Sequence, residues 1–175
     1  MIQKNDTQDK PLVNRVANSG LITFVLEDLV PDFDIETLDI TQFLWKGLVL
    51  KEKEFRAALK AIDWKIYGSK VLCVHCSADA IVPTWAYMLV ASMATPYVKS
   101  TFLGTREEYL KAWFAEAIDN LDIEEYRDAR VVVKGCAREN VPESAYVDLL
   151  SRLQPVVKSI MYGEPCSTVP LYKRR

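Results

Sequence analysis

The chain has 175 residues, of which 50% are hydrophobic and 26% charged, and this composition is typical of one soluble domain with an ordinary core. Its 22 basic and 24 acidic residues give a net charge of -2, so no overall positive field attracts a nucleic-acid backbone. The first ten residues are polar, and no apolar run reaches the roughly 18 residues that a membrane span requires. We therefore expect a cytoplasmic protein that binds neither nucleic acid nor membrane.

The first strand and helix are predicted from local patterns. Leu21–Leu26 follows Gly20 and reads as a buried strand. Between residues 51 and 62, apolar side chains recur at the spacing of one helical face, which predicts an amphipathic surface helix. These side chains are Phe55, Ala58, Leu59 and Ile62.

Three strand-and-helix units follow. The predicted strands are Lys70–Cys76, Tyr97–Leu103 and Arg130–Gly135, and the predicted helices are 83–95, 105–120 and one that opens at Pro142, kinks at Pro155 and ends at Gly163. The helix over 83–95 is apolar on nearly every face, so we expect it to be buried. Repeated strand–helix units favour parallel strands flanked by helices.

The predicted fold is an α/β fold, a single three-layer domain with one largely parallel sheet that contains all three strands. The amino-terminal strand joins that sheet in either direction, parallel or antiparallel. We expect residues 1–12 to form a disordered arm and residues 13–175 to form the domain, and we identify no internal repeat. Residues 163–175 contain two prolines and no periodicity, which predicts an extended tail wrapped over the domain.

Four cysteines offer the clearest candidate chemistry, because clustered thiols in a reducing compartment are metal ligands, redox groups or small buried residues. Cys76 and Cys136 each follow a predicted strand, and ligands bind where the carboxyl ends of parallel strands converge. Neighbouring strands lie about 4.8 Å apart and thiolates bind metals at about 2.3 Å, so adjacent strands would let these two cysteines share an ion. Cys166 lies in the extended tail, and we expect this tail to reach the same edge.

The predicted metal site therefore contains Cys76, Cys136 and Cys166, with Asp79 or His75 as the fourth ligand. Thiolate ligation suits zinc or an iron–sulfur cluster, and nothing in the sequence chooses between them. Strand alternation points Cys73 away from this edge and into the core. His75 would share the face of Cys73, where a structural hydrogen-bonding role competes with metal ligation.

Three alternatives remain open at this point. The three cysteines of the predicted site are equally compatible with inert, buried thiols. A cysteine-dependent enzyme or redox protein would use Cys76, if a helix amino-terminus lowers the pKa of its thiol. No arginine follows any cysteine at the phosphatase-loop spacing, and no glycine-rich nucleotide loop is present. A metal-free interaction module or homodimeric scaffold would use the apolar helix and the tail.

Four sequence blocks add a family resemblance: VNRVANSGLITF, CSADAIVPTWAYML, EEYRDARVVVKGC and VPESAYVDLLSRLQPVVKSIMYGEPCSTVPLYKRR. From about Val13 to the end, the chain resembles an uncharacterised family of Bacteroidetes proteins, a domain of unknown function. The family has no assigned activity and no established catalytic residues. The resemblance implies encoding near iron–sulfur cluster assembly genes, and hence an accessory or carrier role with assembly proteins as partners.

Overall fold

The computed structural model of the protein describes residues 21–135, 140–164 and 167–175. Within these residues the strands form three sheets. One has the order β1-β7-β8-β9, a second has the order β2-β5-β6, and β3 pairs with β4 in a short hairpin. The strands are β1 Leu21–Phe24, β2 Ile35–Asp39, β3 Leu44–Trp45, β4 Val49–Leu50, β5 Val71–His75, β6 Ser100–Leu103, β7 Arg130–Val133, β8 Ser159–Glu164 and β9 Ser167–Lys173.

Four α-helices accompany these strands in the described part of the chain: α1 Glu52–Ala61, α2 Thr84–Ala94, α3 Arg106–Asp119 and α4 Glu143–Leu153. Most strand pairs are parallel, so the predicted α/β class with largely parallel strands is confirmed. The helices agree closely with the predicted ones at α1, α2 and α3. Both sides of the predicted Thr105 capping box are present at the start of α3. None of the described helices is long and apolar enough to cross a bilayer.

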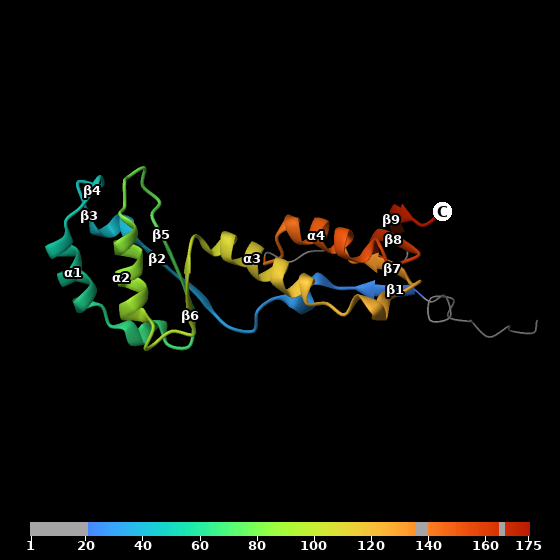
Figure 1. The fold of residues 1–175 in the computed structure, drawn as a ribbon, viewed down its shortest axis with the longest axis horizontal. Helices are drawn as coiled ribbons and strands as arrows, with labels where there is room; N and C mark the ends of the chain where they lie inside the picture. Colours follow the sequence, from blue (N-terminus) through green and yellow to red (C-terminus); the bar gives the residue numbers. More distant parts are fainter. Residues whose placement is uncertain (1–20, 136–139, 165–166) are drawn as a thin grey trace, which may run out of the picture.

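The prediction that the three later strands share one sheet is wrong. Strands β5 and β6 pair with each other, whereas β7 lies between β1 and β8 in the other sheet. Figure 1 shows the two sheets in different halves of an elongated molecule, with α3 between them. Hydrophobic periodicity identifies a buried strand but carries no information about which strands are its neighbours, and this is why the prediction failed.

The amino-terminal strand takes one of its two expected directions, whereas the carboxyl-terminal part of the chain differs from expectation. Strand β1 pairs with β7 in parallel, and the antiparallel strand of that sheet is β9. Helix α4 ends at Leu153 because Pro155 cannot continue it, and the chain then forms strand β8 rather than a kinked helix. The predicted extended tail contains strand β9, Ser167–Lys173, which pairs antiparallel with β8 as the edge strand of its sheet.

An internal repeat, which the sequence analysis did not identify, explains the two sheets. Residues 55–104 and 114–163 align without a gap, at the constant spacing between Phe55 and Phe114. Unusual backbone conformations recur at the same spacing, with φ of 61° at Ser69 and 58° at Asp128. Identical pairs at this spacing include Asp63 and Asp122, Tyr67 and Tyr126, Pro83 and Pro142, Tyr87 and Tyr146, Lys99 and Lys158, and Gly104 and Gly163.

The repeat extends to the first strand of each sheet. Ile35 of β2 pairs with Val71 of β5, and Leu21 of β1 pairs with Arg130, the repeat counterpart of Val71. A 3-10 turn follows each of these first strands, Ile40–Phe43 in one case and Leu26–Leu29 in the other. We call residues 35–104 lobe 1, and residues 21–29 with 106–135, 140–164 and 167–173 lobe 2. Lobe 1 is therefore inserted between the first strand and the remainder of lobe 2.

Each lobe has its own apolar core. In lobe 1, Phe55 and Leu59 of α1 pack with Leu72 and Val74 of β5. In lobe 2, helices α3 and α4 cover the equivalent strand positions, Val131 and Val133, and the counterparts of Phe55 and Leu59 are Phe114 and Ile118. Both cores therefore use the same positions of the repeat.

Helix α3 is shared between the lobes and lies between them in Figure 1. Its Phe114 belongs to the lobe 2 core, whereas the ring of its Tyr109 packs edge-on against Phe102 of β6, with 5.3 Å between centroids. The indole of Trp113 donates a hydrogen bond of 2.8 Å to the carbonyl of Leu29 and packs against Phe33 in the connection between β1 and β2. One helix thus belongs to the lobe 2 core and also covers the lobe 1 sheet.

The expectation that the helix over 83–95 is buried on nearly every face is wrong. Only Ala86, Val90 and Ala94 of α2 are fully buried, and they form one stripe at helical spacing. Met88 on another side of α2 is 67% exposed. Its apolar side chains therefore face solvent at a place where a surface helix ordinarily carries charge.

The matched cores predict matched losses of stability. Phe55→Ala and Phe114→Ala should each lower the free energy of unfolding by about 3–5 kcal/mol, because both rings are fully buried and their removal leaves a cavity. Urea unfolding followed by circular dichroism measures the effect, with Arg56→Ala on the exposed side of α1 as the control. A loss below about 1 kcal/mol for either phenylalanine would contradict the assigned core.

Candidate functional site

Polar side chains gather where β2 and β5 end, at the carboxyl edge of the lobe 1 sheet. Asp39 is the last residue of β2 and lies opposite His75, the last residue of β5. Cys76 and Ser77 follow directly, and Thr41 lies in the 3-10 turn after β2. This is the edge at which parallel sheets bind ligands.

Asp39 holds this edge together. Its carboxylate accepts hydrogen bonds from the Thr41 amide at 2.9 Å, the Ser77 amide at 3.1 Å and the Ser77 hydroxyl at 2.5 Å. Burial would raise the pKa of the Asp39 carboxyl, but the hydrogen bonds from Ser77 and Thr41 outweigh it and hold that pKa well below its usual range. Three hydrogen-bond donors satisfy the carboxylate of Asp39. Asp39 therefore links the ends of β2 and β5, and its carboxylate is not available to act as a base.

Cys76 lies beside this network. Its Sγ is 3.5 Å from the Thr41 hydroxyl and donates to the Ala78 carbonyl at 3.6 Å. Among the described residues, no hydrogen bond or ion pair joins Cys76 to a lysine or arginine, and α2 begins only at Thr84. This helix begins where the sequence predicts it, so Cys76 does not lie directly at a helix amino-terminus, the position on which the cysteine-enzyme hypothesis relied.

Cys73 is a core residue, whereas the side chain of His75 makes no hydrogen bond within the described part of the chain, and its Nδ1 atom is buried without a partner there. Cys73 has no exposed surface, as predicted, and burial raises the pKa of its thiol to about 11. The Nε2 atom of His75 is 3.9 Å from Oδ2 of Asp39, beyond hydrogen-bonding distance.

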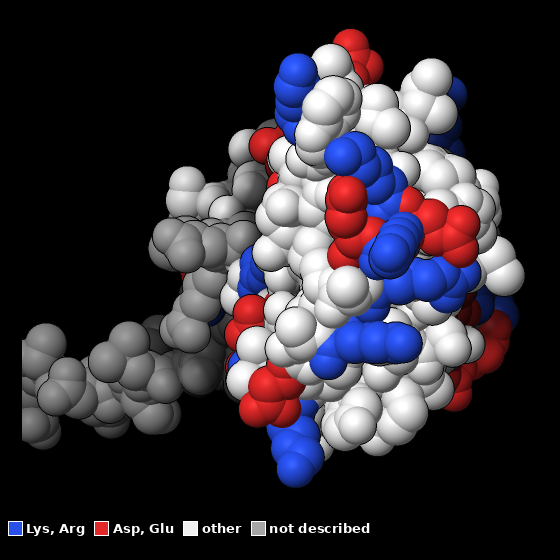
Figure 2. Space-filling view, turned by 90° about the vertical axis from the view of Figure 1, so that its left-hand side faces the viewer, with Lys and Arg blue, Asp and Glu red and all other residues white. Residues whose placement is uncertain are grey.

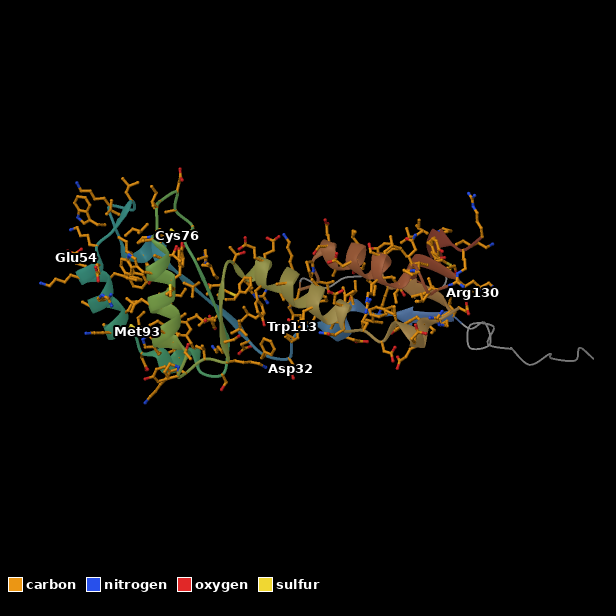
Figure 3. All side chains as sticks on the ribbon, in the orientation of Figure 1. Asp32, Glu54, Cys76, Met93, Trp113 and Arg130 are labelled. Carbon is orange, nitrogen blue, oxygen red and sulfur yellow. The ribbon has the colours of Figure 1, made fainter. Side chains whose placement is uncertain are left out.

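The predicted three-cysteine metal site is only partly within the described residues, because Cys136 and Cys166 lie outside them. Among the residues described, no group of three or more His, Cys, Asp or Glu side chains could hold a metal ion. The premise of adjacent strands is wrong, since β5 and β7 belong to different sheets. Figure 3 labels Cys76 in lobe 1 and Arg130, the first residue of β7, at the far end of lobe 2.

The repeat also corrects the supposed equivalence of two cysteines. The counterpart of Cys76 is Gly135, and Cys136 corresponds to Ser77. Asp79, a suggested fourth ligand, corresponds to Arg138. Zinc or iron–sulfur binding, and partnership with iron–sulfur assembly proteins, therefore stay predictions without the geometric support first given to them.

A different surface of lobe 1 stands out in the structure. A hollow of about 240 Å³ lies between α2 and strand β6, which has β5 as its partner on one side. No strand among the described residues pairs with the other side of β6. The side chains and backbone that line the hollow come from Val74, Thr84, Tyr87, Met88, Ala91, Thr101, Phe102 and Leu103. We call the hollow and the open strand edge together the β6 groove.

In lobe 2 the equivalent edge is closed by the chain itself. Strand β9 pairs antiparallel with β8, the counterpart of β6, and Tyr172 lies opposite Ile160. Tyr172 packs against the lobe 2 core, and Ile160 is fully buried. The counterpart of Ile160 is Thr101, which lines the β6 groove and is partly exposed. Within residues 21–135, 140–164 and 167–175, lobe 1 thus has no counterpart of the strand that completes lobe 2.

Sequence reasoning missed the β6 groove, although a signal for it exists in the sequence. Helix α2 contains no charged residue, whereas α4 has Glu143, Asp148 and Arg152 where α2 has Thr84, Leu89 and Met93. The absence of charge in α2 predicts a buried helix, and this is why the sequence does not point to a surface groove beside it. Once α2 is known to lie on the surface, the same pattern marks a face that another chain can cover.

These features define an α/β protein of two repeated lobes, one closed at its sheet edge and one open. The chain belongs to a family described as Protein of unknown function (DUF2480), whose model matches residues 10–174. Neither the curated proteins nor the solved structures contain a match to it.

The Asp39 network predicts a defined pH dependence of stability. A carboxyl whose pKa is lower in the folded chain stabilises it above the unfolded pKa, about 3.9, and this contribution is lost as the pH falls. Asp39→Asn should lower the free energy of unfolding at pH 7 by about 1–3 kcal/mol and flatten its decline toward pH 3. The control is Asp63→Asn, because Asp63 accepts a single cap bond. Equal urea-unfolding results for both variants at every pH would contradict the role of Asp39.

The two described cysteines should differ in accessibility. In the native chain at pH 8, iodoacetamide should leave Cys73 unmodified, because its thiol is buried and its pKa is raised. Cys76, which is partly exposed, should be modified first, and Cys73 only after unfolding in urea. Peptide mass spectrometry distinguishes the two sites. Native modification of Cys73 at the rate of Cys76 would show that β5 is not buried as described.

Proposed function

We propose that the protein is an interaction module that docks another polypeptide strand at the β6 groove. The observation that carries the proposal is the contrast between the lobes. The chain supplies β9 to the outer edge of β8, and it supplies no equivalent strand to β6 within the described residues. Adding a strand to an open edge is a common mode of polypeptide recognition, because the backbone gives affinity and side-chain pockets give selectivity.

The β6 edge lacks the features that protect sheet edges from unwanted pairing. Edge strands are ordinarily interrupted by proline, charged side chains or bulges. Strand β6 contains Ser100, Thr101, Phe102 and Leu103, with no proline, no charge and no register shift against β5. Leu103 is 63% exposed at the groove. The edge of β6 is therefore suited to pairing with a further strand.

Helix α1, the other helix on this side of the lobe 1 sheet, exposes charged side chains to solvent. Helix α1 exposes Lys53, Glu54 and Arg56 and buries Phe55 and Leu59. Figure 2 looks onto this end of the molecule and shows blue and red side chains near the centre of the face, with others along its outline. A charged, solvated helix beside an uncharged one favours α2 as the docking side.

The proposal predicts protection of α2 in the cell. Met88→Cys should react slowly with a membrane-permeable maleimide in the cells that produce the protein, and rapidly in dilute purified protein. The repeat provides a matched control, Val147→Cys, because Val147 is the counterpart of Met88 on α4 and is 63% exposed.

Peptide mass spectrometry separates these sites from the natural cysteines. Slower modification in the cell at position 88 alone supports docking at the β6 groove. Equal modification at positions 88 and 147, in the cell and in dilute solution, would refute the proposed function.

A further inference from the structure

We infer that the strand that docks on β6 is the β6 strand of a second copy of this chain. The result is a two-fold dimer whose lobe 1 sheets join edge to edge. This inference rests on the proposed function, because it names the occupant of the β6 groove. The argument depends on strand polarity, register and charge.

Strand polarity favours self-pairing. In lobe 2 the added strand β9 runs antiparallel to β8. Two copies of β6 related by a two-fold axis perpendicular to the sheet also run antiparallel, so self-pairing reproduces the polarity that the repeat uses. Such an axis keeps both copies of α2 on one face of the joined sheet, where their exposed apolar sides meet.

The register follows from the positions that line the groove. Thr101 and Leu103 both line it, and alternate residues of a strand share a face. With Phe102 on the two-fold axis, Leu103 of each copy lies opposite Thr101 of the other, on the groove face. Leu103 then occupies the place that Tyr172 takes opposite Ile160 in lobe 2. The 63% of Leu103 that is exposed becomes covered.

The charge pattern permits two identical faces to meet. Residues near a two-fold axis lie close to their own copies, so any charge there repels itself. Between Ala80 and Thr105 the sequence contains one charged residue, Lys99, which lies before β6. The ammonium group of Lys99 lies 3.8 Å from the centre of the Phe33 ring, so it is engaged within its own chain. The counterpart face of lobe 2 has three charged residues on α4 and is closed by β9.

The first experiment is sedimentation equilibrium of the full chain and two matched variants. The wild type should sediment with the mass of two chains at micromolar concentration. Met88→Glu places a charge against its own copy and should raise the dimer dissociation constant by about 100-fold, since truncating or charging a buried interface centre costs several kcal/mol. Val147→Glu makes the same change at the equivalent exposed site of lobe 2 and should leave the dimer intact. Circular dichroism confirms that each variant is folded.

A second experiment tests the register and does not rely on loss of binding. Residues directly opposite each other in an antiparallel pair have β-carbons about 4.5–5.5 Å apart, close enough for a disulfide after small adjustments. The double variant Thr101→Cys, Leu103→Cys should therefore form covalent dimers under mild oxidation, with peptides joined between positions 101 and 103. The double variant Ile160→Cys, Tyr162→Cys is the lobe 2 counterpart and should form none between chains, because β9 occupies that edge.

The outcomes separate the inference from the proposed function. A monomeric wild type at all accessible concentrations overturns the inference, as does a dimer that Met88→Glu leaves unchanged. If the chain is monomeric but position 88 is protected in the cell, the β6 groove docks a different protein and the proposed function stands. If the chain is monomeric and position 88 is unprotected, both fail.

Discussion

Helix α3 is the contact on which the two-lobed arrangement depends. Phe114 and Ile118 of α3 form part of the lobe 2 core, and its Tyr109 packs against Phe102 in lobe 1. Trp113 joins the same helix to the connection that leads from β1 into β2. Because lobe 1 is inserted between β1 and the rest of lobe 2, the helix that closes lobe 2 also fixes the inserted lobe beside it.

The repeat shows how two lobes with the same architecture come to present different surfaces. In lobe 2, β9 covers the outer edge of β8, so Ile160 has become a core residue. In lobe 1 the counterpart Thr101 remains at the surface beside an uncharged helix. The repeat therefore has the same strand edge in both lobes, and among the described residues the chain covers it only in lobe 2.

The lobes have also diverged at their carboxyl edges. Asp39 at the end of β2 has Val25 as its counterpart, so the hydrogen-bonded junction between strand ends belongs to lobe 1 alone. This polar edge lies in the lobe that presents the β6 groove. Since the Asp39 carboxylate is occupied by donors from Thr41 and Ser77, its physical effect is to hold the ends of β2 and β5 in register.

The sequence alone determined the elements whose signals are local. The capping box at Thr105, the apolar stripe of α1 and the buried run of β5 each predict structure correctly, because spacing along one element decides which side chains leave water. Which strands pair was decided only in three dimensions, since Val-rich strands such as β5 and β7 offer similar edges to several partners. The tertiary structure likewise decided that α2 lies at the surface. An apolar helix is more stable when its surface is removed from water. Only the completed fold shows whether other parts of the same chain cover that surface.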